Sequence, residues 1–320
     1  MDKIVAYISS RNNYEMLEKE VYKNVNFEGI QLINIDDGSE SSQVEMGIEI
    51  CKKHNIIFLK NSGRGLHAAT KTAIDYISQT LPECKFAYWL THDCYPLTLN
   101  MFSKLSSLIE DEKLNQFGVI GFNTIWKKFT MSEEQFRSSS AEGKYCGVLG
   151  RAVLTAVPGA GWYRSSDFDL PWEIWGKNIA VESVTDMNLM INIDAYNKHI
   201  ECDEWFHHFC WADDLCLQFL SKNVYNVTLA DFYVYHDQDL KSKYKIPVNS
   251  YHAAKMGDQY HFSSHDRHYM RWIEKWGFDR NWQKESKKIN EQIIEKNKNN
   301  LLYEFMIHDY KKGPLKTFDL

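Results

Sequence analysis

Two acidic turns follow short apolar segments of this sequence. The apolar residues 86–90 lead into Thr91–His92–Asp93, and the apolar residues 32–35 lead into Asp36–Asp37–Gly38–Ser39. A carboxylate buried at the end of a central strand is costly unless a cation or a hydrogen-bond donor meets it. In open α/β sheets, ligands bind at the carboxyl edge of the strands. The two turns therefore predict a site for a polar ligand, with or without a metal ion.

The sequence around these turns alternates between short apolar strands and longer helical patterns. We expect strands at residues 4–8, 32–35, 56–59, 86–90 and 118–122, and helices at residues 14–22, 42–54, 65–78 and 101–111. This alternation is typical of βαβ units with a parallel sheet. Right-handed crossovers then place the carboxyl ends of these strands on one edge.

The alternation stops after residue 122. Residues 123–184 mix Gly, Pro, Ser and aromatic residues without a period, which predicts an aromatic-rich set of functional loops. Strands are expected again at 187–193 and 224–235, and helices at 195–199 and 213–221. Residues 281–309 predict one charged amphipathic helix, whose apolar stripe contains Ile289, Ile293, Leu301 and Phe305.

Composition narrows the class of protein. The 320 residues suffice for one large domain, alone or with a helical appendage, and the net charge of −6 argues against a nucleic-acid binder. Aromatic residues make up 14% of the chain, which more often reflects core packing than carbohydrate binding. The seven cysteines form no CxxC pair, which favours free thiols in a reducing cytoplasm. We see no signal peptide, and no apolar run approaches the ~20 residues of a membrane span.

Several segments together resemble the GT-A glycosyltransferases, and among them the large family 2 of inverting enzymes. IVAYISSRNN is similar to the first nucleotide-contacting loop of that family, INIDDGSESS to its acidic turn, and LKNSGRGLHAATKTAIDYI to its Asn-x-Gly loop and helix. YWLTHDCYP stands where the DXD metal motif stands. INIDAYNKHIECDEWFHHFCWADDLCLQF resembles the segment that ends in an acidic pair, and VTLADFYVYHDQ the late strand that ends in a metal-binding His.

Two features depart from the pattern of the family. The metal motif reads Thr91–His92–Asp93, so that only its last Asp is present. The acidic pair falls on Trp211–Ala212 when the sequence is aligned on DEWF, and on Asp213–Asp214 when it is aligned on the following helix.

The resemblance implies a fold and a reaction. Residues 1–245 would form a GT-A domain, a mixed α/β sheet flanked by helices, with a nucleotide-sugar half (1–122) and an acceptor half (123–245). Residues 246–320 would form a mostly helical extension. The reaction would move a sugar from a nucleotide-diphosphate sugar to a glycan or lipid-linked glycan, in the cytoplasm or at the inner membrane face. The product would be a surface polysaccharide such as lipopolysaccharide or capsule.

The resemblance also implies a metal ion, Mn²⁺ or Mg²⁺, held by Asp93 and His236. A divalent cation offsets the charge of the departing diphosphate, and an imidazole ligand favours Mn²⁺. The competing interpretations are a helix N-cap for Asp93 and an ordinary strand-end histidine for His236.

Donor binding is expected from residues of the early loops. These residues are Ser9, Arg11, Asp36, Asp37, Asn61, Gly63, Arg64 and His92. Asp36 and Asp37 supply acceptor oxygens for a base and a ribose, although Asp–Gly is also strong turn chemistry. Gly63 and Gly65 either let the backbone approach the donor or only begin the next helix.

Inversion requires a base that takes the proton of the acceptor hydroxyl, and Asp213 or Asp214 is the candidate. The alternative is that Asp213 caps the helix, but one of the pair can cap while the other points inward, so both stay candidates. If neither is the base, Glu204 or Asp186 is the next candidate. Trp162, Glu204 and His207 are expected to line the acceptor pocket, unless the last two lie in a solvated turn.

Two other functions stay open. A sugar-nucleotide pyrophosphorylase would need a glycine-rich loop after its first strand, which ISSRNN lacks. A catalytically silent sugar-binding homologue agrees with the incomplete metal motif.

Residues 281–316 contain eight Lys against five Asp and Glu. Their apolar stripe therefore either lies on an anionic membrane or docks on the domain or on a second subunit, and we favour docking.

Overall fold

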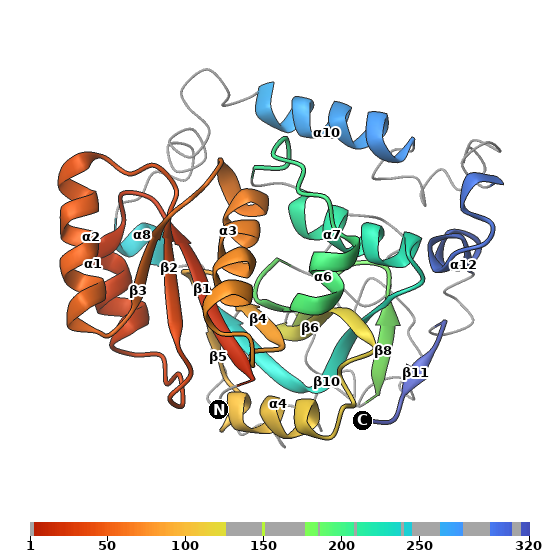
Figure 1. Cartoon of the computed structure of the whole chain (residues 1–320), viewed down its shortest axis with the longest axis horizontal. Helices are drawn as coiled ribbons and strands as arrows, with labels where there is room; N and C mark the ends of the chain where they lie inside the picture. The colour runs from red at the N-terminus through yellow and green to blue at the C-terminus, as the bar shows by residue number, and fades with distance from the viewer. Residues whose placement is uncertain are drawn as a thin grey trace.

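The computed structural model describes residues 3–125, 149–150, 177–184, 186–207, 210–237, 240–244, 263–277, 295–308 and 315–320. One mixed sheet runs through the molecule in the order β11-β8-β10-β6-β9-β4-β1-β2-β3, with β5 paired to β10 and β7 to β6 (Figure 1). The strands are β1 (Ile4–Ser10), β2 (Leu32–Asp36), β3 (Ile57–Lys60), β4 (Phe86–Trp89), β5 (Cys94–Pro96), β6 (Phe117–Ile125), β7 (Leu149–Gly150), β8 (Asn178–Val181), β9 (Leu189–Asn192), β10 (Tyr225–His236) and β11 (Thr317–Phe318).

Helices cover both faces of the sheet. They are α1 (Tyr14–Met16), the π-helix η1 (Leu17–Tyr22), α2 (Ser41–Lys53), α3 (Gly65–Thr80), α4 (Met101–Glu110), α6 (Ile193–His199), α7 (Trp211–Ser221), α8 (Leu240–Lys243), α10 (Ser263–Trp276) and α12 (Leu301–Ile307). Side chains of α3, α6 and α7 pack on one face, and those of α1, η1 and α4 pack on the other.

The parallel part of the sheet is the part that the sequence predicts. β1 pairs in parallel with β2 and β4, and β2 pairs in parallel with β3. β9 then lies antiparallel between β4 and β6, and β10 runs parallel to β6. The carboxyl ends of β1, β2 and β4 therefore meet at one edge, and the expected mixed α/β sheet flanked by helices is confirmed.

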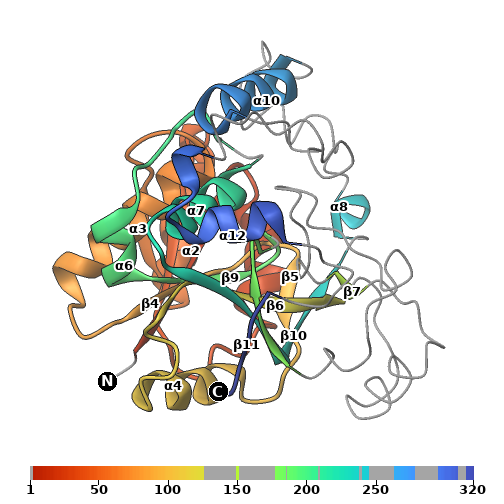
Figure 2. The ribbon, with the colours of Figure 1, turned by 90° about the vertical axis from the view of Figure 1, so that its right-hand side faces the viewer.

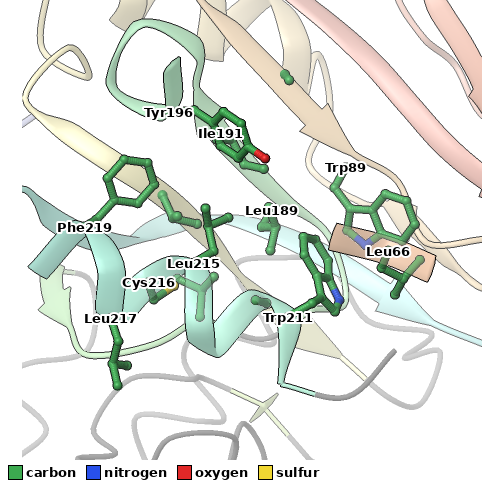
Figure 3. Close-up of a cluster of buried hydrophobic side chains, with 14 of the residues drawn as sticks. Leu66, Trp89, Leu189, Ile191, Tyr196, Trp211, Leu215, Cys216, Leu217 and Phe219 are labelled. Atoms are coloured by element: carbon green, nitrogen blue, oxygen red, sulfur yellow. The ribbon is translucent and has the colours of Figure 1, made fainter. Parts of the chain in front are cut away.

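Alternation along the strands divides the core into two layers. Val5 and Tyr7 of β1 belong to the layer under α3 and α7, whereas Ile4, Ala6 and Ile8 belong to the layer over η1 and α4. Figure 3 shows the first layer, in which Trp211 of α7 lies against Trp89 of β4 with ring centroids 5.5 Å apart. This contact fixes the start of α7 against the strand that precedes Asp93.

The C-terminal region differs from the expected single helix over residues 281–309. The chain turns at residues 298–300, and α12 begins only at Leu301, so the prediction of one continuous helix is wrong. Ile289 and Ile293 lie outside the described residues. Leu301 and Phe305 are buried in the layer formed by α7, which confirms docking for this part of the stripe (Figure 2).

Residues after 245 also extend the sheet itself. β11 pairs with β8, and neither strand was expected from the sequence. The expected domain boundary at residue 245 stays a prediction, but the described residues on both sides of it share one sheet and one core. Among the described residues, no helix has the length and apolar character needed to span a membrane.

Candidate functional site

The loop after β1 and the acidic turn after β2 are held together by hydrogen bonds. The backbone N–H of Asp37 donates to the carbonyl of Ser10 over 2.8 Å. Asp36 is buried and accepts from the Tyr14 hydroxyl at 2.5 Å, and from the N–H groups of Gly38 and Ser39 at 3.2 and 3.1 Å. Asp36 therefore acts as the anchor of the turn, and the tight-turn interpretation holds for it.

Four polar atoms of these two loops are buried without a hydrogen-bond partner in the described part of the chain. They are Ser9 Oγ, Arg11 Nε, Asn13 Nδ2 and Asp37 Oδ2. Buried polar groups in folded proteins are normally paired. Because they come from two loops that are bonded to each other, they form a set of unused donors and acceptors at the carboxyl edge of β1 and β2.

The loop that precedes α3 contacts the predicted acceptor segment. Asn61 Nδ2 donates to Asp37 Oδ1 at 2.7 Å, and the N–H of Gly65 donates to the same oxygen at 2.9 Å. The N–H of Leu66 donates to the carbonyl of His207 at 2.6 Å, and His207 Nδ1 lies 3.3 Å from the carbonyl oxygen of Arg64. The structure thus brings predicted donor-binding and acceptor-binding residues together.

The glycines of this loop leave room for that contact. A Cβ on Gly65 would lie 2.4 Å from the backbone of His207, and one on Gly63 would lie 2.6 Å from Glu204 Oε1. Gly65 also has a φ of +75°, which L side chains rarely adopt. The glycines are therefore required because the loop packs closely against Glu204 and His207. Neither interpretation of the sequence contained this role.

The turn that carries Asp93 is braced by the segment before β9. The N–H of Thr91 donates to Asn188 Oδ1 at 2.8 Å, and the Thr91 hydroxyl donates to the carbonyl of Asp186 at 3.0 Å. Asp93 is 2% exposed, and its Oδ2 lies 3.8 Å from Nε2 of the buried His92. Asn100 is the residue that precedes α4, so the helix-cap interpretation of Asp93 is wrong.

The backbone brings the two predicted metal ligands to one place. β5 and β10 pair antiparallel with His236 opposite Cys94, and the N–H of Asp237 donates to the carbonyl of Asp93 at 2.7 Å. Only the backbone of His236 is described. Among the described residues, no group of three or more His, Cys, Asp or Glu side chains could hold a metal ion.

The two candidate bases have different surroundings. Cys210 precedes α7, so both aspartates lie in the first turn, and the alternative interpretation of Asp213 as the helix cap is wrong. Asp214 is fully buried and accepts from Gln218, Lys275 and Trp276 at 2.7, 2.8 and 2.9 Å. Asp213 is 8% exposed and accepts from the Ser183 hydroxyl at 2.5 Å.

Glu182 is a carboxyl that the sequence did not single out. It is 1% exposed, and neither of its carboxyl oxygens has a hydrogen-bond partner in the described part of the chain. Burial raises the pKa of Glu182 well above its usual range, and the nearby Asp213 carboxylate raises it further. Ser183 donates to Asp213, and the carbonyl of Asp186 accepts from Thr91, so Ser183 contacts the candidate base and Asp186 contacts the candidate metal turn.

Charged residues of α10 bind two aspartates, Asp203 and the candidate base Asp214. Arg271 and Lys275 lie 2.9 and 3.5 Å from Asp203 Oδ2, and Lys275 also pairs with Asp214. Burial alone would raise the pKa of Asp203, but the hydrogen bond from Arg271 and the charge of Lys275 lower it overall. His67 accepts from the N–H of Asp203 at 2.8 Å, and burial lowers the pKa of its imidazole.

The predicted site residues thus lie in three places, which are the donor loops, the metal turn and the start of α7. The donor group contains Ser9, Arg11, Asp36, Asp37 and Asn61, and it reaches Glu204 and His207 through the loop at Gly63–Gly65. The metal turn donates a hydrogen bond to Asn188, and the α7 carboxyl of Asp213 accepts one from Ser183. Trp162 lies outside the described residues.

Comparison with solved structures identifies the fold. A structure of GalNAc-T7 with UDP, GalNAc and Mn²⁺ superposes with a TM-score of 0.50 at 12% identity, over 73% of this chain and 44% of that one. The mannosyltransferase PcManGT from Pyrobaculum calidifontis, in complex with GDP-Man and Mn²⁺, superposes with a TM-score of 0.45 at 10% identity, over 85% of this chain and 64% of that one. No family model and no curated protein sequence matches. The chain therefore has the GT-A fold of glycosyltransferases, as its sequence predicts.

Proposed function

We propose that this protein is an inverting, metal-dependent glycosyltransferase that moves a sugar from a nucleotide-diphosphate sugar to a hydroxyl of a glycan. The observation that carries the proposal is the hydrogen bond between Asp237 and Asp93, which joins β10 to the turn after β4. It brings an Asp and a His to the sheet edge where β1 and β2 also end. The acceptor belongs to surface polysaccharide synthesis in this proposal.

The donor is held by the unused polar atoms of the first two loops. Asp37 accepts from Asn61 and Gly65 through Oδ1, which leaves Oδ2 to accept from a ribose or base. Ser9 Oγ can donate or accept, and Arg11 Nε can donate to an anionic or carbonyl oxygen. Asp36 contributes indirectly because its oxygens hold the turn.

The residues at the metal turn fit a divalent cation in their chemistry. A carboxylate and an imidazole suit Mn²⁺ better than Mg²⁺, and the diphosphate of the donor would complete the ligand set. When bound, such an ion would offset the negative charge that develops on the leaving diphosphate. Asp93 and His236 are the residues that would hold it.

Asp213 is the better candidate for the base. Asp214 already accepts hydrogen bonds from Gln218, Lys275 and Trp276. Its carboxylate therefore has little capacity left to take a proton from a substrate. Asp213 precedes Asp214 by one residue, keeps 8% exposure and is positioned by Ser183. Glu182 lies beside it as a second carboxyl that burial keeps protonated.

The test is a transfer assay with radiolabelled UDP-, GDP- and dTDP-sugars in the presence of Mn²⁺. We expect release of the nucleotide diphosphate and transfer of the label with one of these donors. Asp93→Ala should abolish the Mn²⁺-dependent turnover without changing the unfolding midpoint, and the exposed Asp111→Ala serves as the matched control. Wild-type turnover in Asp93→Ala would show that the metal assignment is wrong.

A catalytically silent sugar-binding protein is the second candidate. The observation in its favour is that Asp214 is saturated by α10 and that Ala212 occupies the position of the family base in one alignment. Binding of a nucleotide without hydrolysis or transfer across the same panel would favour it. Reversible exchange of pyrophosphate would instead identify a pyrophosphorylase.

A further inference from the structure

A cavity of about 470 Å³ lies beside the β5–β10 pair. Its walls come from the end of η1 and the following turn, from β5 and the residues after it, and from the end of β10. The volume is within the range of roughly 300–1,000 Å³ that small-molecule sites occupy. Of the predicted donor, acceptor and metal residues whose side chains the structure describes, none lines it.

Two tyrosines provide an aromatic wall. Tyr95 and Tyr235 are directly opposite each other in the β5–β10 pairing, so their side chains lie on the same face. Their ring centroids are 6.5 Å apart at an interplanar angle of 34°. Leu97 and Leu99, which continue the same wall, are 46% and 77% exposed. Such rings and apolar side chains bind the C–H faces of a ligand.

The rest of the lining is polar, and its charge excludes an anion. Glu20, Glu28 and Asp237 line the cavity together with Asn24 and other amide and hydroxyl side chains, and among the described residues no Lys or Arg lines it. A nucleotide or phosphate would therefore meet the carboxylates of the described lining, of which Glu20 is paired with Lys243 outside the lining. Carboxylates and amides that surround an aromatic wall are instead suited to neutral hydroxyl groups.

The acids do not converge on a cation. Glu20 accepts from Lys243 and from the Tyr244 hydroxyl, and these bonds together lower its pKa. Glu28 accepts from the N–H groups of Phe102 and Ser103 at 3.3 and 2.9 Å, so it is committed to the start of α4. Both carboxylates keep some acceptor capacity for a hydroxyl, but neither is available as a full metal ligand.

The Tyr95 hydroxyl has an unmet hydrogen-bonding requirement. Its oxygen is buried and has no hydrogen-bond partner in the described part of the chain. A tyrosine hydroxyl can donate one hydrogen bond and accept others. A polar atom of a ligand would satisfy it, because a buried polar group without a partner is unfavourable.

We propose that this cavity binds a neutral saccharide unit, stacked on Tyr95 and Tyr235 and hydrogen-bonded by the surrounding carboxylates, amides and the Tyr95 hydroxyl. This inference stands independently of the proposed transfer reaction, because the cavity lies apart from the donor loops and its chemistry alone selects the ligand. A bound sugar at this place would lie beside the strand end that carries His236.

The test is saturation-transfer difference NMR and calorimetry on the full chain with glucose, galactose, mannose, N-acetylglucosamine, lactose and chitobiose, in EDTA. We expect at least one of these sugars to bind, and glucose 1-phosphate to bind more weakly than glucose. Tyr95→Phe removes one hydroxyl and should weaken binding about three- to tenfold. Tyr235→Ala should abolish it, whereas Tyr303→Phe on α12, far along the chain, should leave it unchanged.

Three results would overturn the inference. The first two are no binding of any sugar in the panel, and equal affinity in Tyr95→Phe and the wild type. The third is binding of Mn²⁺ or Ca²⁺ in a separate titration without EDTA that Tyr235→Ala abolishes, together with no binding of a sugar. A parallel thermal-shift titration with UDP, GDP and dTDP separates this result from the proposed function. Nucleotide binding without saccharide binding would contradict the cavity alone, and the reverse would contradict the donor site alone.

Discussion

At the scale of single residues, α7 assigns different roles to two neighbouring carboxylates. Asp214 has no exposed surface and is paired with Lys275, whereas Asp213 is 8% exposed and accepts from the Ser183 hydroxyl. The sequence shows two identical residues in one helical turn. It cannot show which one meets α10, because that helix is more than forty positions further along the chain.

We predict that Asp213→Asn and Asp214→Asn fail in opposite ways. Asp213→Asn should reduce turnover by ~10²–10⁴-fold with little loss of stability, because the base is lost and the bond from Ser183 can persist. Asp214→Asn should lower the free energy of unfolding by about 3 kcal/mol, because it leaves Lys275 partly uncompensated. Single-turnover kinetics and urea unfolding measure the two effects. If both variants transfer sugar at the wild-type rate, Glu204 or Asp186 becomes the candidate base.

Glu182 should make stability depend on pH. In the unfolded chain its carboxyl ionises near pH ~4.3, whereas burial and Asp213 keep it protonated in the folded protein to a much higher pH. Above pH ~4.3 the folded state therefore binds the extra proton, and each further pH unit removes ~1.4 kcal/mol of stability until the folded pKa is reached.

Glu182→Gln removes this titration, so the variant should gain stability relative to the wild type as the pH rises from 5 to 8. Urea unfolding at four pH values measures the difference. A difference between the two proteins that is constant over this range would contradict the assignment of a buried, protonated Glu182.

At the scale of elements, hydrophobic periodicity predicts the parallel strands and their helices well. The expected strand over residues 32–35 is β2, and the expected helix over 65–78 is α3, each within two residues at either end. β5, β8 and β11 were missed because each has four residues or fewer and depends on pairing with distant strands. Glu182 was missed for the same reason, since it follows β8 in a segment without a period.

The loop before α3 provides a test of how two elements meet. Gly65 and Gly29 both have a positive φ, of 75° and 88°, but only Gly65 has backbone atoms of another segment where a Cβ would be. Gly29→Ala should therefore cost about 1 kcal/mol, which is the conformational penalty alone. Gly65→Ala should cost at least about 2 kcal/mol more, because His207 must move.

Chemical denaturation of both variants measures these costs, and nucleotide titration reports on the donor loops. Because the carbonyl of His207 is bonded to the N–H of Leu66, we expect Gly65→Ala also to weaken nucleotide binding. Equal losses of stability in the two variants would show that the contact between the loops contributes nothing beyond the backbone conformation.

At the scale of the whole molecule, the C-terminal residues belong to the body of the protein. α10 supplies ion pairs to Asp203 and Asp214, α12 packs on α7, and β11 adds a strand to the sheet. The sequence predicted the apolar stripe on α12 and its docking, because amphipathic periodicity is local. It could not predict the strand partner of β11, because that partner lies more than one hundred residues earlier.

The two faces of α12 therefore predict opposite results. Phe305 is fully buried in the α7 layer, so Phe305→Ala should lower the free energy of unfolding by ~3–5 kcal/mol. Ile307 on the same helix is 58% exposed, and Ile307→Ala should change stability by no more than about 0.5 kcal/mol. Urea unfolding compares the two variants.

Sedimentation with anionic liposomes completes the test, because a stripe that covers α7 cannot also lie in a membrane. If Phe305→Ala leaves stability unchanged but abolishes co-sedimentation, α12 is a membrane element and its docking on α7 does not hold the molecule together.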